Sequence, residues 1–375
     1  MKRAGIAALV LMLFAAPGHG DAPKPRPRAR ELGVIIGGFQ PGPLDAITDV
    51  PGVKVGQVTL AHGAARTGVT AIIPRDDIWH QKLPAGAAVL NGCGELTGLW
   101  WVLESGWLEV PIVYTNTHSV PRCMDGVVAW MMKRYPKIGV DEDVVTPVVG
   151  ECDDSTLNDI RGRHVHEDHV LRALDSASSG PVAEGGVGAG TGMICFGYKG
   201  GVGTASRRVP MGPRTWTLGC LVVTNFGNRN EVIVNGRHYG EELARRPAPP
   251  EKHTDGSIQI LFATDAPLDS RELTRLAHRA AIGLGRVGSH MHHGSGDFAL
   301  AFSTAHTLPS EANNQRNHFA VLSDLDLDPL FTAASDVVEE SVLNALFRAE
   351  TTTGRGGVVV PALPLDLLTP PAHGP

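Results

Sequence analysis

The chain has 375 residues, of which 42% are hydrophobic and 19% are charged, which is typical of a soluble globular protein. Its formal net charge is −6 and no basic run offsets it, so the sequence argues against a nucleic-acid partner. This length suits one large domain or two ordinary ones.

The first residues have the pattern of an export signal. Lys2 and Arg3 precede an apolar run over 4–16, and small residues follow it. This order is typical of a secretory signal peptide, here over 1–20, and the run is shorter than the about 20 apolar residues of a membrane-spanning helix. We therefore expect a periplasmic or secreted protein that does not act on a membrane. A Pro- and Arg-rich flexible arm is expected over 21–31.

Helical and β-prone patterns alternate along the rest of the chain. Apolar residues recur at helical spacing over 269–284 and 335–351, and Asp269 followed by Glu272 has the form of a capping box. In chain order, the pattern predicts a helix over 157–177, strands over 215–225 and 257–265, a helix over 269–284, a strand over 298–304, a helix over 335–351 and a strand over 358–361.

A polar, proline-rich linker over 245–255 ends just before the strand that starts at Ser257. An exposed loop beside a buried strand is a suitable cleavage site. Because glycine tolerates strained dihedrals, Ser257 Oγ can attack the Gly256 carbonyl and form an ester that water opens. The freed α-amine, with a pKa of about 7.7–8.0, can then serve as base for its own hydroxyl. Taken alone, a Gly-Ser step before a strand is usually a turn.

Two further segments carry polar side chains at strand ends. Asn225 closes the strand over 215–225, where its amide can donate to an oxyanion; a simple turn residue before Gly227 is the alternative. Ser295 and Asp297 lie two residues apart, so on extended backbone they face the same side and can both reach Ser257. The alternative there is a Gly-Ser-Gly turn with a solvated aspartate.

No cofactor or metal is expected from the remaining motifs. The glycine-rich run over 185–192 lacks the full dinucleotide fingerprint, and the five cysteines contain no C-x-x-C pair, although one disulfide stays open. The histidines form two clusters without the spacing of a metal site: His164, His166 and His169, and His290, His292 and His293.

Several motifs occur together in one order along the chain. They are 47–56, 90–98, 180–193, 199–207, 255–258 and 263–268. With them, the sequence resembles the L-aminopeptidase / D-amino-acid esterase-amidase and β-peptidyl aminopeptidase family of self-processing N-terminal serine hydrolases. The resemblance implies an α/β fold, a four-layer α-β-β-α sandwich, in which an α chain over 32–256 and a β chain over 257–375 form one hydrolase domain. It also implies a homo-oligomer of these α/β heterodimers, and a place for the glycine-rich run beside the active site.

The resemblance assigns roles to individual residues. Ser257 matches the nucleophile, Asn225 the oxyanion donor, Ser295 an assisting hydroxyl and Asp297 its acidic partner. Glu151 matches a carboxylate that binds the substrate ammonium, which would restrict the enzyme to substrates with a free amino end because a buried carboxylate needs a cation.

The implied activity is hydrolysis of short peptides, amides or esters with a free amino end. One departure is that some relatives carry a Tyr shortly after the matching glutamate, whereas 152–155 contains none; substrate range and rate therefore stay open. Two alternatives also stay open: an acyltransferase of the same wider fold, for which a Thr nucleophile would be expected, and an unprocessed, non-catalytic binding protein.

Overall fold

The computed structural model describes residues 25–246, 256–310 and 316–368. The predicted signal peptide over 1–20, the start of the arm and most of the linker before Ser257 lie outside these residues. Among the residues described, no helix is long and apolar enough to cross a membrane.

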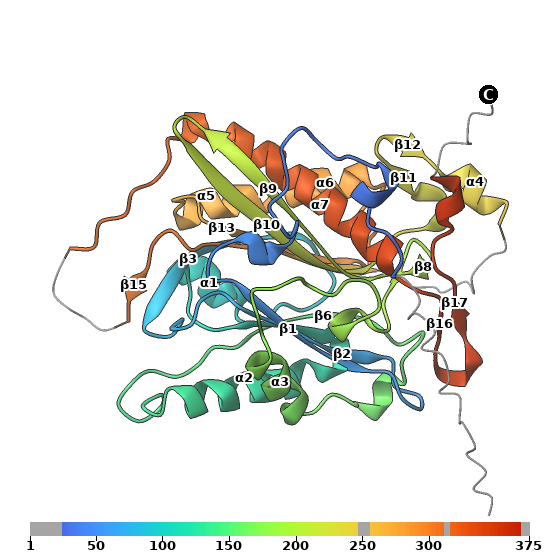
Figure 1. The fold of residues 1–375 in the computed structure, drawn as a ribbon. Coiled ribbons are helices and arrows are strands. Elements are labelled where there is room, and N and C mark those ends of the chain that lie inside the picture. Colours follow the sequence, from blue (N-terminus) through green and yellow to red (C-terminus); the bar gives the residue numbers. More distant parts are fainter. Residues whose placement is uncertain (1–24, 247–255, 311–315, 369–375) are drawn as a thin grey trace, which may run out of the picture.

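Two β-sheets lie face to face, and helices cover the outer side of each (Figure 1). The smaller sheet has the strand order β1 (Lys54–Leu60), β2 (Thr67–Ile73), β5 (Ile112–Asn116) and β6 (Val148–Cys152). The larger sheet has the order β15 (Leu308–Pro309), β3 (Gln81–Gly92), β14 (Gly296–Ser303), β13 (Ser257–Thr264), β10 (Arg214–Asn225) and β9 (Gly201–Met211), and β4 (Trp107–Leu108) pairs with β3.

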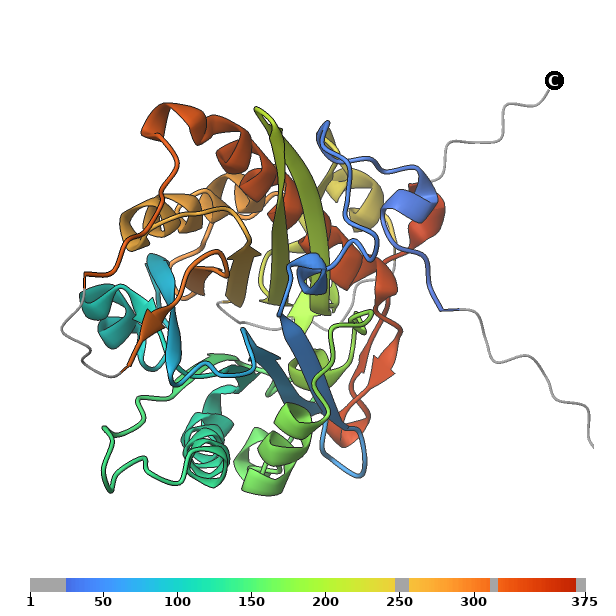
Figure 2. The ribbon, with the colours of Figure 1, turned by 60° about the vertical axis from the view of Figure 1, so that its left-hand side comes forward.

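Among the described residues, five helices form the two outer layers. Helices α2 (Val120–Arg134) and α3 (Glu167–Asp175) pack on the smaller sheet, and α5 (Ser270–Ala277), α6 (Ala280–Arg286) and α7 (Asp328–Arg348) lie over the larger one (Figures 1 and 2). The predicted α-β-β-α sandwich is therefore confirmed. The remaining short elements are α1 (Leu99–Ser105), α4 (Gly240–Ala244), β7 (Ile194–Cys195), β8 (Tyr198–Lys199), β11 (Ile233–Val234), β12 (Arg237–His238), β16 (Thr352–Thr353) and β17 (Val359–Val360).

Strand β13 lies in the middle of the larger sheet and is buried on both faces. Leu261 and Ala263 point into the core between the sheets, whereas Ile260 and Phe262 point into the core under the helices. Because side chains alternate along a strand, Ser257 lies on the same side as Leu261 and faces the smaller sheet. Burial on both faces also explains the continuous apolar run that follows Ser257 in the sequence.

The segments before and after Gly256 share this sheet. Strand β13 pairs antiparallel with β10 and parallel with β14, and β14 pairs with β3. Strands β10 and β3, from 32–256, thus flank β13 and β14, which follow Gly256. Neither segment can complete the larger sheet without the other.

The predicted strands agree with β10, β13, β14 and β17, but two helix predictions differ. The helix predicted over 269–284 is α5 followed by α6, although its capping box forms, with Asp269 Oδ1 accepting from Glu272 N at 2.8 Å. The helix predicted over 157–177 is wrong before Glu167. Arg163 there has a left-handed φ of 47°, which an α-helix does not accommodate.

The flexible arm predicted over 21–31 is also wrong for its described part. Arg26 Nε donates to Phe347 O at 2.8 Å, and Arg28 Nε lies 2.8 Å from Glu184 Oε2. Arg30 Nε lies 2.7 Å from Glu340 Oε1. Figure 2 shows this blue segment beside the red C-terminal part of the chain. Its arginines, which suggested a solvated arm, are instead donors to acids and carbonyls of the folded domain.

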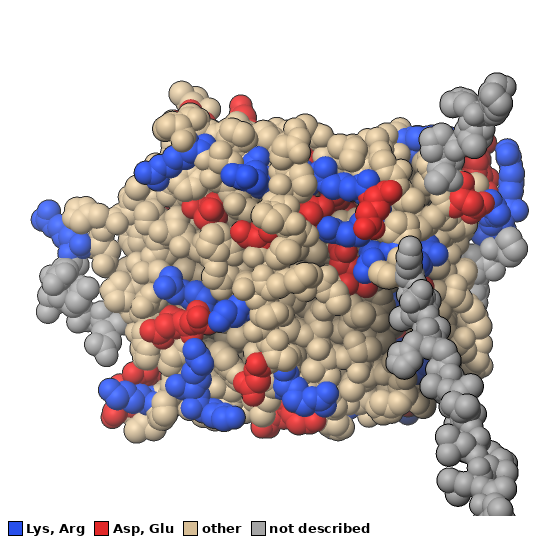
Figure 3. Space-filling model, in the orientation of Figure 1, with Lys and Arg blue, Asp and Glu red and all other residues tan. Residues whose placement is uncertain are grey.

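The cysteines and the surface charges complete the description. All five cysteines are unpaired, and four of them are buried. On the face shown in Figure 3, basic and acidic side chains are interspersed. That face offers no continuous basic stripe that could follow a phosphate backbone.

Candidate active site

Three strand ends meet at the Gly256–Ser257 peptide. Ser257 is the first residue of β13 and is 6% exposed. It lies directly opposite Asn225, the last residue of β10, and opposite Gly296, the first residue of β14. Predicted strand ends that are far apart in the sequence are therefore neighbours in the sheet.

The Gly256 carbonyl is held between its attacking hydroxyl and a backbone donor. Ser257 Oγ donates to Gly256 O at 2.7 Å, and Gly296 N donates to the same oxygen at 3.0 Å. A main-chain N–H aimed at a carbonyl oxygen stabilises the negative charge that grows there when the carbon is attacked. The arrangement thus suits attack by Ser257 on its own preceding peptide bond.

Close packing explains why the residue before Ser257 is a glycine. A Cβ at position 256 would lie 2.5 Å from Phe226 Cα and 2.7 Å from Asn225 O. No side chain fits at these distances, so the main chains of Gly256 and β10 can approach only because position 256 lacks a Cβ.

The amide of Asn225 is buried and has a defined orientation. Its Oδ1 accepts from Ile194 N at 3.0 Å, and its Nδ2 donates to Asp153 O at 2.9 Å. Because Oδ1 must face the Ile194 N–H, Nδ2 must face the other way. The amide nitrogen carries a second hydrogen beside this bond, and Asn225 is the direct register partner of Ser257.

Ser295 and Asp297 form the hydroxyl–carboxylate pair that the sequence predicts. Both are buried, and Ser295 Oγ donates to Asp297 Oδ1 at 2.7 Å. Burial raises the pKa of Asp297 to about 6, although the Ser295 hydroxyl opposes this shift. They flank Gly296, the register partner of Ser257. No hydrogen bond between described residues joins either side chain to Ser257 while the Gly256–Ser257 bond is intact.

Glu151 reaches this region from the opposite sheet, near the end of β6. It is 3% exposed, and its carboxylate accepts from Thr117 Oγ1 and from Glu95 N, the latter at 3.1 Å. Burial raises its pKa. No described Lys or Arg forms an ion pair with Glu151, so it is a buried carboxylate that can take up a cation.

Gly94 separates Glu151 from the strand ends around Ser257. A Cβ on Gly94 would lie 3.1 Å from Glu151 Oε1 and 3.2 Å from Gly296 Cα. Glu151 and Gly296 therefore lie on two sides of one glycine. A further link is the Gln259 side chain of β13, whose Nε2 donates to Glu151 O at 2.9 Å.

A cleft of about 360 Å³ opens beside the Gly256–Ser257 bond. Its residues are mostly polar or small: Phe226, Gly227, Asn228, Gly256, Ser289, His292, His293 and Ser295. His292 Nε2 lies 2.8 Å from Glu231 Oε1 and 3.1 Å from Asn228 Nδ2. Of the predicted site residues, Gly256 and Ser295 line this cleft, which therefore reaches the carbonyl side of the bond that Ser257 attacks.

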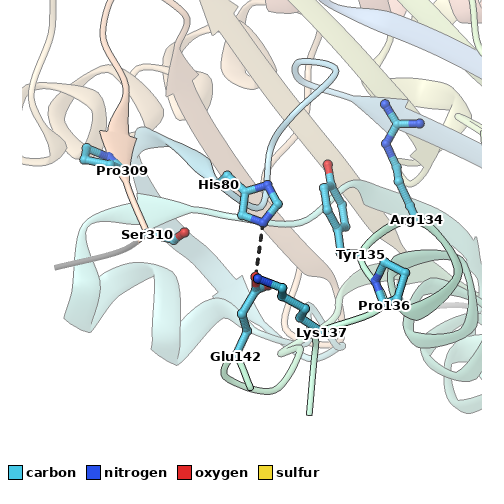
Figure 4. A pocket seen from close by; sticks show the side chains of 8 residues that line it. All are labelled: His80, Arg134, Tyr135, Pro136, Lys137, Glu142, Pro309 and Ser310. Atoms are coloured by element: carbon cyan, nitrogen blue, oxygen red, sulfur yellow. Dashed lines mark ion pairs between the residues drawn. The ribbon is translucent and has the colours of Figure 1, made fainter. Parts of the chain in front are cut away.

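A larger cavity of about 540 Å³ lies elsewhere and contains none of the predicted site residues. In Figure 4, His80 and Glu142 point toward each other across it, and their His80 Nε2 and Glu142 Oε1 atoms lie 3.5 Å apart. Arg134, Tyr135 and Lys137 complete much of its wall. Its size alone therefore does not identify it as the active site.

The structure brings together all the residues predicted to act, and it adds some that sequence reasoning missed. Asn225, Ser295 and Asp297 lie at the strand ends beside the Gly256–Ser257 peptide, and Glu151 lies beyond Gly94 from them. The additional ones are the Gly296 N–H, the Thr117 hydroxyl and the Gly94 spacer; of these only Gly94 lay within a motif used for the resemblance, 90–98. Among the described residues, no cluster of three or more His, Cys, Asp or Glu is placed to hold a metal.

Comparisons with known proteins match the chain over most of its length. A family model described as peptidase family S58 matches residues 45–360. The chain is 42% identical to the β-peptidyl aminopeptidase BapA of Sphingosinicella microcystinivorans, over 97% of this chain and 95% of that protein.

Two similar solved structures cover nearly the whole chain. One is a Burkholderia sp. β-aminopeptidase, with a TM-score of 0.85 and 43% identity over 91% of this chain and 97% of that one. The other is the L-aminopeptidase D-Ala-esterase/amidase of Ochrobactrum anthropi, described as a serine aminopeptidase with a variant of the Ntn hydrolase fold. It has a TM-score of 0.85 and 40% identity, over 92% of this chain and 97% of that one.

Proposed function

This chain belongs to peptidase family S58, and from this premise we propose that its nucleophile is Ser257, freed by self-cleavage after Gly256. The protein is a serine aminopeptidase with an N-terminal nucleophile. The observation that supports Ser257 most directly is the pair of hydrogen bonds to Gly256 O, from Ser257 Oγ at 2.7 Å and Gly296 N at 3.0 Å.

Self-cleavage proceeds in two steps. Ser257 Oγ attacks the Gly256 carbonyl carbon while the Gly296 N–H stabilises the oxyanion. The C–N bond then breaks, the Ser257 nitrogen takes up a proton, and an ester links Gly256 to Ser257 Oγ. Water hydrolyses this ester, which leaves the Gly256 carboxylate on one chain and Ser257 with a free amine on the other.

Turnover uses the same hydroxyl on a substrate carbonyl. Glu151 binds the substrate ammonium, and Ser257 Oγ attacks while its own amine, or Ser295 linked to Asp297, takes the proton. Asn225 Nδ2 stabilises the oxyanion. The proton passes to the leaving amine or alcohol, and water then hydrolyses the acyl-enzyme. Since water is the acceptor, the product is a free acid, which distinguishes a hydrolase from an acyltransferase.

The substrates are short peptides, amides or esters with a free amino end, and we include β-amino acids at that end. Relatives named as β-peptidyl aminopeptidases, at 42% and 40% identity, support this extension. Comparing a β-alanyl with an α-alanyl p-nitroanilide would test it. Cleavage of the α-alanyl compound alone would contradict it.

Two further proposals concern location and assembly. The pattern over 1–20 supports export to the periplasm or beyond, which N-terminal sequencing of secreted protein would test.

Trp100, which is 82% exposed beside half-exposed Trp101, supports burial between copies in a homo-oligomer. Native mass spectrometry of the wild type and of Trp100→Glu would test the second proposal.

Intact mass and N-terminal sequencing of the purified protein test the proposal as a whole. We expect two chains, one beginning Ser257-Ile258-Gln259, and a single unbroken chain for Ser257→Ala. An unbroken wild-type chain would instead favour a non-catalytic binding protein.

A further inference from the structure

The ammonium of Lys199 is a buried cation that the mechanism above leaves unused. Lys199 ends β8 and is 0% exposed. Its Nζ donates to three main-chain carbonyls, Gly190 O at 2.8 Å, Met193 O at 3.0 Å and Gly200 O at 2.7 Å. All three hydrogens of the ammonium are therefore used. Each bond fixes the main chain at a residue before or just after β8.

One of these carbonyls belongs to a peptide group that also contacts Asn225. The Met193–Ile194 peptide accepts from Lys199 through its oxygen and donates through its N–H to Asn225 Oδ1 at 3.0 Å. A continuous row of hydrogen bonds thus runs from the ammonium, through one peptide group, to the Asn225 amide. It continues from Asn225 Nδ2 to Asp153 O.

We infer that Lys199 is a positioning residue for the oxyanion donor: through the Met193–Ile194 peptide it fixes and polarises the Asn225 amide. The inference rests on the role proposed above for Asn225. Hydrogen bonds in a row strengthen one another, by about 10–30% for each bond. A cation at one end makes the peptide N–H a stronger donor, which in turn makes Asn225 Nδ2 a stronger donor to an oxyanion.

The glycine-rich run over 185–192 is shaped for this ammonium. A Cβ on Gly186 would lie 3.3 Å from Lys199 Nζ, and a Cβ on Gly190 would lie 2.5 Å from Val202 N. The glycines therefore let main-chain carbonyls close around a cation of the protein itself. This accounts for a motif that otherwise suggests a nucleotide-binding loop.

The protonation state of Lys199 provides a way to test this link. Burial lowers its pKa to about 7, while the nearby charge of Asp154 opposes the shift. A neutral amine has two hydrogens instead of three. Deprotonation therefore releases one of the three carbonyls and weakens the row that ends at Asn225.

The first experiment observes Asn225 directly in uncleaved protein. In Ser257→Ala labelled with ¹⁵N-asparagine, the side-chain amide signals of Asn225 are assigned by comparison with an added Asn225→Ala substitution. We expect these signals to shift with a midpoint near pH 7 in the chain that has Lys199, and to show no such step in Lys199→Met. Signals that do not titrate, or that titrate alike in both chains, would overturn the inference.

This measurement does not depend on activity. If Lys199→Met folds poorly, Lys199→Arg takes its place in the comparison, because a guanidinium keeps its charge through pH 7. It also separates the two proposals. Asn225 signals coupled to Lys199 in a protein whose Asn225→Ala variant keeps full activity would refute the role of Asn225 but not the link.

The second experiment measures turnover by the processed enzyme. We expect Lys199→Met to lower kcat by about 10- to 100-fold with KM nearly unchanged, less than the about 10²–10³-fold of losing an oxyanion donor outright. The control is Lys82→Met, because Lys82 Nζ pairs with Glu109 Oε2 at 2.5 Å near the other end of β3. A raised KM with unchanged kcat, or equal losses in both variants, would contradict the inference.

Discussion

Asn225 and Ser257 are direct register partners across β10 and β13, the last residue of one strand facing the first residue of the next. Side chains directly opposite each other in an antiparallel pair have Cβ atoms about 4.5–5.5 Å apart. The sheet itself therefore places an amide donor beside the hydroxyl that attacks. The two residues are 32 positions apart in the sequence, 225 to 257, and the main-chain pairing of β10 with β13 brings them together.

Replacing Asn225 tests this relationship. We expect Asn225→Ala to lower kcat by about 10²–10³-fold with little change in KM, because the donor acts on the transition state rather than on bound substrate. Steady-state kinetics on the processed protein measures the effect. Asn228→Ala is the control, since Asn228 lies in the neighbouring cleft and bonds to His292 instead. Equal effects of the two changes would refute a specific role for Asn225.

The fit of Gly256 predicts that self-cleavage fails when a methyl group is added there. In Gly256→Ala the new Cβ would lie 2.5 Å from Phe226 Cα, so the scissile peptide must move away from Ser257 Oγ or from Gly296 N. We expect processing to slow by at least tenfold, as measured by the mass of the chains over time after synthesis.

Gly285→Ala is the matched control for that change. Gly285 lies in α6 and has nothing within 4 Å of an added Cβ. It should be processed at the wild-type rate and gain up to about 1 kcal/mol in the free energy of unfolding. Rapid processing of Gly256→Ala would show that the close contact with Phe226 does not hold the scissile bond.

The buried carboxylate of Glu151 leads us to expect that substrates need a free amino end. Leaving a buried charge without its partner costs about 3–5 kcal/mol, so Glu151→Gln should lower kcat/KM by a factor of the order of 10² or more for substrates with a free ammonium. Substrates whose amino group is acetylated should be poor for both proteins, and the difference between the two should vanish. A Glu151→Gln enzyme that keeps its preference for free amines would place the ammonium site elsewhere.

The sequence predicted those parts of the site that depend on strand ends and on alternation along a strand. Ser295 and Asp297 face each other because extended residues two apart share a side, and Ser257 and Asn225 lie where β-prone runs begin or end. The role of Glu151 was available only from the resemblance, and its approach from the other sheet was not predicted. The Gly296 N–H and Lys199 were missed because their roles depend on which main-chain atoms the packing brings near them.

The errors in the predicted elements have the same origin. The helix over 157–177 fails before Glu167 because Arg163 adopts a left-handed conformation, which no periodicity of apolar residues reveals. The arm from residue 25 onward packs on the domain because its arginines meet Glu184, Glu340 and the Phe347 carbonyl. Composition shows that a segment is charged, but it does not show whether the folded domain places acidic side chains next to that segment.

Asp297 predicts a pH dependence of stability whose sign is fixed by its raised pKa. Burial raises the pKa from 3.8 to about 6, so between these values the folded chain binds a proton that the unfolded chain has released. The free energy of unfolding must therefore fall as pH rises from about 4 to about 6, by about 2–3 kcal/mol for this group. Urea unfolding of uncleaved Ser257→Ala at several pH values measures it.

Because Glu151 and Glu184 also have raised pKa values, the quantity to compare is the difference from Asp297→Asn in the same background. That difference should change across this range, since an amide does not titrate. A constant difference would mean that the pKa of Asp297 is the same in the folded and the unfolded chain, so that burial does not raise it.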